Sequence, residues 1–155
     1  MSETQGALGG EIRDNRHYLP VRVYYEDTDV GGVVYYANYL RFMERGRSDF
    51  MRLLGVDQRA LMAGADGTRL AFVARRCEID YLKPARFDDE IEVATWITEA
   101  RGASVVMAQD VRRGGVVLTQ ARVTIAATGD KGQPRPLPKW LRHIFNMLVC
   151  SNPAR

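Results

Sequence analysis

A single long amphipathic helix pattern, with mostly strand patterns after it, constrains the fold of this 155-residue chain more than any other feature. Apolar residues recur there at three- and four-residue steps, which is the spacing of one helix face; they are Tyr36, Tyr39, Leu40, Met43, Phe50, Leu53 and Leu54. Gly55 is placed to end the helix, because glycine adopts a left-handed conformation without a Cβ penalty. Gly46, in mid-helix, lowers helix stability and therefore indicates a close packing contact.

Alternating apolar residues predict strands on both sides of this helix. One half-buried strand pattern precedes the helix at 19–25, and four more follow it at 71–81, 91–97, 104–112 and 116–128. In the first of these four, we expect one side to carry Val73, Cys77, Ile79 and Tyr81. Cys77 is then most simply a small buried side chain.

Two short helices and a tight turn complete the pattern. Asp57 could cap a helix that runs to Met62. The glycine pair at 114–115 predicts a tight hairpin between the last two strands. A final helix is expected from Lys139 to about Met147.

The order of these elements predicts the fold class. One long helix among strands points to an α+β layer in which a five-stranded antiparallel sheet wraps around the long central helix. A helix covered on one side only leaves apolar surface for another subunit to bury, so we expect a homodimer or homotetramer. We expect one domain at 17–147, between a flexible N-terminal tail at 1–16 and a C-terminal tail at 148–155.

Composition excludes several classes of function. The net charge of +3 is small and the basic residues are spread among acidic ones, so a nucleic-acid surface is not indicated. Two distant cysteines and two histidines do not give the usual zinc spacings, and they suggest reduced thiols. The N-terminus has no apolar core for export and no stretch approaches membrane-spanning length. We therefore expect a cytoplasmic protein without membrane insertion.

The run DTDVGGVVYYANY, at 27–39, is the most informative local motif. An acidic turn and two glycines lead directly into the helix pattern. A carboxylate near the free N–H groups of a helix entrance could act on a polarised carbonyl, which is the minimum equipment for acyl transfer. The alternative is that Asp27 and Asp29 only close a turn, and on spacing alone that is the commoner case.

A resemblance to a known family shifts this balance. VRVYYEDTDVGGVVYYANYLRFMERGR, at 21–47, resembles the signature of the 4-hydroxybenzoyl-CoA thioesterase family, and within it the Tol–Pal-associated acyl-CoA thioesterases. Further matches are FVARRCEIDYLKPARFDDEIEV at 72–93, RGAS at 101–104 and PRPLP at 134–138. The resemblance covers about Leu19–Phe145. It implies the hotdog fold and hydrolysis of an acyl-CoA thioester to free coenzyme A and a carboxylic acid, without a metal or redox cofactor.

The resemblance also implies roles for individual residues. Asp29 matches the family's catalytic carboxylate, which acts as nucleophile or as general base, whereas Asp27 is expected to order the turn. The backbone N–H of Tyr36 matches the donor that binds the thioester carbonyl at the helix N-terminus. Many relatives carry histidine at this position, so the backbone donor is kept here while an imidazole is absent. For Tyr35 we expect core packing.

The remaining matched positions are expected to bind substrate. Two glycines would let the backbone approach the acyl group, and arginine suits the phosphates of coenzyme A. The expected substrate-binding residues are Gly31, Gly32 and Val33 at the acyl group, Arg101 and Ser104 beside the pantetheine arm, and Arg135 near the nucleotide.

Two other functions remain open on the sequence. A hydratase or dehydratase for carrier-bound acyl chains would use a histidine with an acid, and the absence of histidine from Val30–Leu54 argues against it. A non-catalytic acyl-CoA or envelope-linked binding module would bind thioesters without turnover. Release of free thiol separates these possibilities from a thioesterase.

Overall fold

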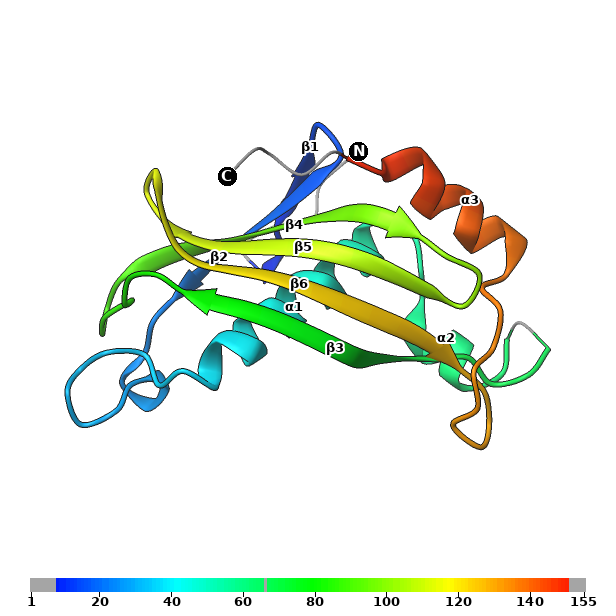
Figure 1. Ribbon diagram of the computed structural model, residues 1–155, viewed down its shortest axis with the longest axis horizontal. Coiled ribbons are helices and arrows are strands. Elements are labelled where there is room, and N and C mark those ends of the chain that lie inside the picture. The colour runs from blue at the N-terminus through cyan, green and yellow to red at the C-terminus, as the bar shows by residue number, and fades with distance from the viewer. Residues whose placement is uncertain (1–7, 66, 151–155) are drawn as a thin grey trace.

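The computed structural model describes residues 8–65 and 67–150, and their strands form one antiparallel sheet (Figure 1). The sheet order is β1-β2-β4-β5-β6-β3. In chain order the strands and helices are β1 (Glu11–Arg13), β2 (Arg16–Arg22), α1 (Asn38–Leu53), α2 (Gln58–Met62), β3 (Ala71–Tyr81), β4 (Glu90–Ala100), β5 (Ser104–Arg113), β6 (Val116–Thr128) and α3 (Lys139–Leu148).

The expected α+β architecture is confirmed, with one strand more than predicted. Figure 1 shows the sheet curved over α1, while α3 packs at one end. The sixth strand is β1, which pairs with β2 from Glu11↔Tyr18 to Arg13↔Arg16. It lies inside the segment 1–16, which the sequence analysis expected to be a flexible tail. The strand was missed because a short polar strand shows too little alternation to be recognised. Residues 1–7 and 151–155 of the two expected tails lie outside the described residues.

Apolar side chains from α1 and from the concave face of the sheet form the core. On α1 the buried apolar side chains are Tyr39, Phe42, Met43, Phe50 and Met51. They pack with sheet residues such as Val93, Ile97 and Met107. Burial of each large apolar side chain contributes about 1.5–3 kcal/mol, so this contact dominates the stability of the fold. None of the described helices is long and apolar enough to cross a membrane.

Gly46 marks the closest approach of α1 to the sheet, as its mid-helix position predicted. A Cβ atom there would lie 3.0 Å from Val93 Cγ1 and 3.1 Å from Thr95 Oγ1. The fully buried Gln109 fills the remaining gap, since its Nε2 donates to the Met43 carbonyl and to Thr95 Oγ1, each at 2.9 Å. The helix backbone therefore rests almost directly on β4 and β5.

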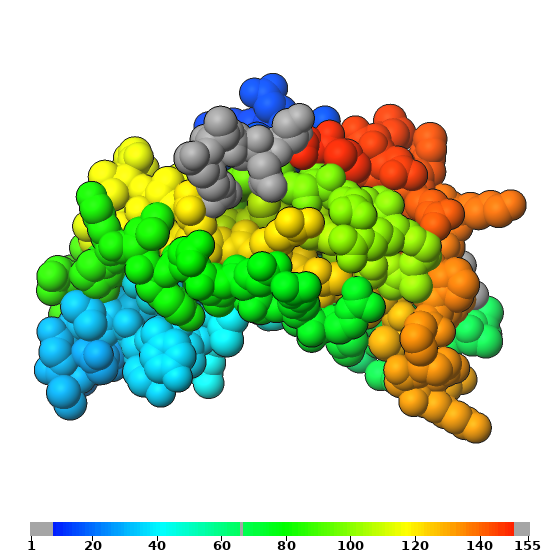
Figure 2. Space-filling view, viewed as in Figure 1, coloured from blue at the N-terminus to red at the C-terminus, as the bar shows by residue number. Residues whose placement is uncertain are grey.

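Strand β3 is an exposed edge and corrects two expectations. A bulge between Ala74 and Arg76 reverses the side-chain alternation. Val73 therefore pairs with Ala126 on the outer face, whereas Cys77 pairs with Val123 on the α1 face. Cys77 is exposed rather than buried, because nothing in the described chain covers this edge. Figure 2 shows β3, in green, along a rim whose outline is hollowed between two projecting ends of the molecule.

We predict that Gly46→Val destabilises the fold by about 1–3 kcal/mol, because a branched side chain would overpack the contact with Val93 and Thr95. Urea denaturation measures the change. Arg45→Val, on the exposed side of the same helix, is the matched control and should lose only helix propensity, roughly 0.5 kcal/mol. Equal losses in both variants would contradict the close-packing role of Gly46.

Candidate functional site

The acidic motif forms a tight, exposed turn before α1. Thr28 and Val34 form an isolated bridge, and the Asp29 N–H donates to the Val33 carbonyl at 2.9 Å. The Asp29 carbonyl accepts from Gly32 at 3.1 Å, and Gly32 has a φ of 79°, which favours glycine. The exposed carboxylate of Asp29 accepts one hydrogen bond, from the Gly31 N–H at 2.8 Å, and forms no ion pair with the described residues. It is a charged group open to a ligand.

Asp27 has the structural role that the sequence suggested. Its Oδ2 accepts from the Tyr24 N–H at 2.8 Å. Its carbonyl accepts from the Tyr35 N–H at 3.0 Å and from Asn38 Nδ2 at 2.9 Å. Asp27 thereby ties the turn to the first residue of α1, and its carboxylate is committed to the backbone.

The entrance to α1 presents an unused backbone donor. The Tyr36 carbonyl accepts from the Tyr39 N–H and from the Tyr81 hydroxyl, each at 3.3 Å. Within the described ranges, the Tyr36 N–H has no hydrogen-bond acceptor. It lies next to the positive end of the helix dipole. Tyr35 is 48% exposed, so the expectation that it packs in the core is wrong; its ring lies against Tyr36 instead.

The turn is held by a second segment, Pro84–Asp89, which precedes β4. The Val34 N–H donates to the Ala85 carbonyl at 2.8 Å, and the Phe87 N–H donates to the Gly32 carbonyl at 3.0 Å. The Tyr39 hydroxyl accepts from the Ala85 N–H at 3.0 Å. The position of Asp29 therefore depends on residues about 55 positions away in the chain as much as on its own neighbours.

The residues predicted to bind the pantetheine arm and the nucleotide lie at the other end of the sheet. The Asp29 turn sits beside the start of β4, whereas Arg101 and Ser104 flank the turn after its end (Figure 1). Eleven residues of strand separate these ends, which is about 35 Å at about 3.3 Å per residue. The structure brings Arg135 to the Arg101–Ser104 turn, because the Leu137 N–H donates to the Gly102 carbonyl at 2.9 Å. It does not bring any of these residues to Asp29 in the same chain.

This far end carries one basic residue that the sequence analysis missed. Arg101 is paired with Glu99, Nε to Oε2 at 2.6 Å, and Ser104 is buried. Arg135 donates to the Thr68 carbonyl at 3.0 Å. Arg135 and Arg142 together line an open cavity of about 450 Å³ with Gly102, Ala103 and three further residues of the proline segment. Arg142 lies on α3, outside every motif, so only its position on the exposed helix face could have pointed to it.

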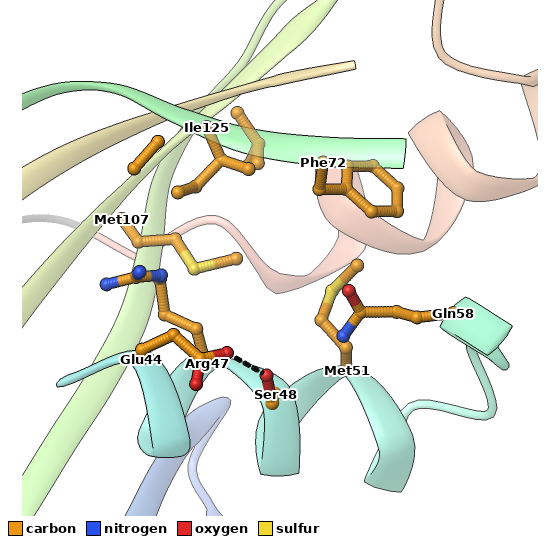
Figure 3. A pocket seen from close by; sticks show the side chains of 10 residues that line it. Glu44, Arg47, Ser48, Met51, Gln58, Phe72, Met107 and Ile125 are labelled. Atoms are coloured by element: carbon orange, nitrogen blue, oxygen red, sulfur yellow. Dashed lines mark hydrogen bonds between the residues drawn. The ribbon is translucent and has the colours of Figure 1, made fainter. Parts of the chain in front are cut away.

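A separate apolar cavity of about 230 Å³ lies between α1 and the sheet beneath β3 (Figure 3). Its apolar lining includes Met51, Phe72, Val105, Met107 and Ile125. Its polar wall is on α1, where Arg47 Nη1 donates to Gln109 Oε1 at 3.0 Å. Burial lowers the pKa of the Arg47 guanidinium. No residue of the predicted site lines this cavity; from β3, Phe72 and Ala74, which precede the bulge, line it.

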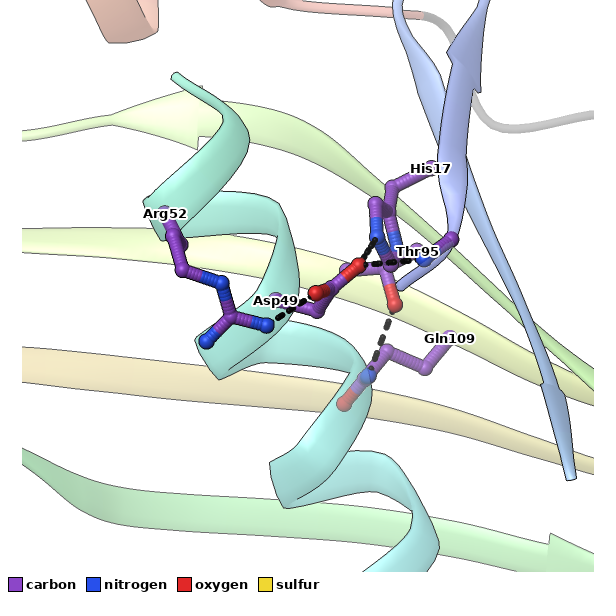
Figure 4. Close-up of polar contacts among 6 residues, drawn as sticks. His17, Asp49, Arg52, Thr95 and Gln109 are labelled. Carbon is purple, nitrogen blue, oxygen red and sulfur yellow. Dashed lines mark hydrogen bonds and ion pairs between the residues drawn. The ribbon is translucent and has the colours of Figure 1, made fainter. Parts of the chain in front are cut away.

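A polar cluster lies on the buried face of α1 (Figure 4). Asp49 Oδ2 accepts from the Gly10 N–H at 2.8 Å and lies 2.6 Å from His17 Nε2, while Arg52 pairs with Oδ1. Because a carboxylate only accepts, His17 carries its proton on Nε2; its Nδ1 has no partner among the described residues. This cluster fastens the β1–β2 hairpin to α1 and lies apart from the Asp29 turn.

Burial and hydrogen bonding both shift the pKa values of this cluster: burial is the largest effect on His17. It lowers the pKa of His17, although the hydrogen bond and charge of Asp49 act in the opposite direction. The pKa of Asp49 is also lowered: burial alone would raise it, but the hydrogen bonds from Gly10 and His17 outweigh that effect. Across residues 8–65 and 67–150, no group of three or more His, Cys, Asp or Glu side chains could hold a metal ion.

Comparisons with known proteins agree on one family. The family model described as "Thioesterase superfamily" matches residues 31–120. The "Acyl-CoA thioesterase YbgC" of Haemophilus influenzae is 41% identical over 137 residues, which are 87% of this chain and 98% of that protein. The "Acyl-CoA thioester hydrolase YbgC" of Escherichia coli is 47% identical over 122 residues, 77% of this chain and 88% of that protein.

Solved structures show the same similarity. A probable thioesterase from Bartonella henselae is 42% identical, with a TM-score of 0.77, and covers 79% of this chain and 99% of its own. A hypothetical protein from Thermus thermophilus has a TM-score of 0.78 at 22% identity, covering 88% of this chain and 99% of its own, and shows the fold alone.

The His17–Asp49 pair predicts a pH dependence of stability. Below the ordinary histidine pKa of about 6.5, the unfolded chain takes up a proton that folded His17 does not, because its pKa is lowered. The unfolded state then binds more protons, so the free energy of unfolding falls as the pH falls below that value. Urea denaturation between pH 7.5 and about 5 measures this loss, above the range where Asp49 titrates.

His17→Gln should flatten this dependence, because glutamine can still donate to Asp49 but does not titrate in this range. His143→Gln, at an exposed position of α3, is the matched control and should leave the pH profile unchanged. A profile that keeps its slope without His17 would show that another group causes it.

Proposed function

The chain belongs to the thioesterase superfamily, and from this membership we propose that it is an acyl-CoA thioesterase, which hydrolyses an acyl-CoA thioester to free coenzyme A and a carboxylic acid. The family resemblance and the hotdog fold expected from the sequence are confirmed. The names of relatives at 41% and 47% identity support the activity and the substrate class. A cytoplasmic location and an association with the Tol–Pal system stay predictions.

One observation carries the proposal at the level of residues. A single exposed turn offers an unpaired carboxylate, Asp29, and leads to an unused N–H group, that of Tyr36, at the entrance of a helix. Hydrolysis of a thioester needs a base or nucleophile and a donor for the oxygen that becomes negative. The glycines of the turn leave room for the acyl group close to the backbone.

In the proposed reaction the thioester carbonyl accepts a hydrogen bond from the Tyr36 N–H, and Asp29 approaches from the other side. Asp29 acts in one of two ways. As a general base it takes a proton from water, whose oxygen attacks the carbonyl carbon. As a nucleophile it forms an anhydride that water then opens. In both cases the carbon–sulfur bond breaks and coenzyme A leaves as a thiol. The Tyr36 side chain is not required for either route.

We further propose that the substrate spans two subunits. Arg101, Ser104 and Arg135 lie about 35 Å from the Asp29 turn along β4, too far to share one site with it in the same chain. The eleven-residue strand β3 pairs with β6 on one side, and its other side is an exposed edge with no strand partner among the described residues, which a second copy could extend. In an antiparallel arrangement of two copies along β3, the Asp29 turn of one copy would lie toward Arg101, Ser104 and Arg135 of the other.

We predict that Asp29→Asn lowers kcat for acyl-CoA hydrolysis by roughly 10²–10⁴-fold, the usual contribution of a positioned base. The substitution keeps the shape of the side chain and removes its charge. Release of free thiol from acyl-CoA substrates of graded chain length is the measurement, with Tm as a check on folding. Asp27→Asn is the matched control two residues away and should act through stability. Full turnover by Asp29→Asn at an unchanged Tm would refute the proposed role.

We also predict that Arg135→Ala raises KM for acyl-CoA and leaves hydrolysis of an acyl-pantetheine, which has no nucleotide, unchanged. The reason is that phosphate contacts supply binding far from the reacting carbon. If the site spans two subunits, co-expressed Asp29→Asn and Arg135→Ala chains should form hybrids with one intact site. Such hybrids should turn over acyl-CoA with the wild-type KM, whereas the Asp29→Asn parent lacks kcat and the Arg135→Ala parent has a raised KM. Failure to recover the wild-type KM would place both residues in the same subunit's site or Arg135 outside it.

A further inference from the structure

The segment Pro84–Asp89, on which the Asp29 turn rests, is held in place by the end of strand β5. The segment Pro84–Asp89 pairs with the turn through the bonds of Val34 to Ala85 and of Phe87 to Gly32. The segment closes on itself, because the Arg86 N–H donates to Asp89 Oδ2 at 2.8 Å and the Asp89 N–H donates to the Arg86 carbonyl at 3.1 Å. Its shape determines where the backbone of the Asp29 turn lies.

Arg113, the last residue of β5, reaches both ends of this segment. Its Nη1 donates to Asp89 Oδ2 at 2.7 Å and to the Pro84 carbonyl at 3.2 Å. The pKa of Asp89 is lowered: burial alone would raise it, and the bonds from Arg86 and Arg113 outweigh that effect. Asp89 is therefore an ionised acceptor shared between a backbone N–H and a guanidinium, and such charge-assisted bonds hold their geometry well.

We propose that Arg113 is a positioning residue for hydrolysis: through Asp89 and Pro84 it fixes the segment on which the Asp29 turn rests. The inference rests on the proposed function, since it assumes that Asp29 acts on the thioester. Arg113 does not touch Asp29, and its effect passes through two backbone pairings.

The exposure of the pair separates this role from a role in overall stability. The side chains of Arg113 and Asp89 are 39% and 24% exposed, and partly exposed ion pairs contribute little to folding. The rate of a positioned reaction is far more sensitive, because a displacement of about 1 Å at the reacting groups can lower it by about 10²-fold. Loss of Arg113 should therefore reduce kcat while the protein stays folded.

The neighbouring residue provides a matched control. Arg112 pairs with Asp110 at 3.0 Å, and these side chains are 24% and 5% exposed. This pair is more buried than the Arg113–Asp89 pair, and in the described chain Arg112 pairs with Asp110 on its own strand rather than with the segment 84–89. If kcat simply followed stability, Arg112→Met would be the more damaging change. If Arg113 acts by positioning, Arg113→Met is the more damaging one.

The experiment compares kcat, KM and Tm for both methionine variants, assayed well below their Tm values. We expect Arg113→Met to lower kcat by roughly 10- to 100-fold with KM nearly unchanged, and Arg112→Met to keep kcat. Arg113→Lys keeps the charge without the planar fork, so its kcat should be intermediate. Wild-type kcat in Arg113→Met, or equal losses in both methionine variants, would overturn the proposal.

A double variant makes the coupling explicit. In an Asp29→Asn background, Arg113→Met should cause no further loss of the residual thiol release, because the group it positions is already gone. Additive losses would show that Arg113 acts elsewhere. If Asp29→Asn itself keeps full activity, the proposed role of Asp29 is wrong, and Arg113 then has no catalytic group to position. If Asp29→Asn is inactive but Arg113→Met is normal, only the positioning role fails.

Discussion

The close approach of α1 to the sheet at Gly46 is the contact on which the rest of the structure depends. Without a side chain at this position, the helix backbone comes within reach of Val93 and Thr95, and Gln109 can bond to the Met43 carbonyl. This contact sets the height of α1 above β4 and β5. Because α1 is one rigid element, the same contact also fixes its first residue, and so the Tyr36 N–H that precedes it.

The site is built at the place where three parts of the chain meet. The turn of Asp29 leads into α1, the segment 84–89 lies beneath the turn, and the end of β5 holds that segment through Arg113. Asp27 binds the backbone on both sides of the turn and so leaves Asp29 as the open carboxylate. Each of the two carboxylates accepts one backbone hydrogen bond, but Asp27 is half-buried and its carbonyl also accepts from Tyr35 and Asn38, whereas the Asp29 carboxylate is exposed.

Prediction from the sequence succeeded where the pattern was local. The α+β class, the span of α1 and its end at Gly55, the cap at Asp57 and the limits of β3 and β6 are all set by near neighbours, and the structure agrees with them. The strand expected at 19–25 lies instead at Arg16–Arg22, and the strand expected at 91–97 is longer, at Glu90–Ala100. It failed at β1, at Tyr35 and along β3. The bulge beside Arg75 depends on pairing with β6, which is about 50 residues away, so no local period could reveal that Cys77 and Val73 lie on opposite faces.

The sequence by itself determined the family, the fold class and the motif that carries Asp29 and Tyr36, because these depend on residue type and on short spacings. Only the tertiary structure decided how that motif is held: the segment 84–89, distant in sequence, bonds to the backbone of the turn at Val34 and Gly32, while the Tyr36 N–H has no acceptor among the described residues. It also separated Arg101 and Arg135 from Asp29 by the length of β4. A strand is rigid and extended, so residues at its two ends cannot meet within one chain.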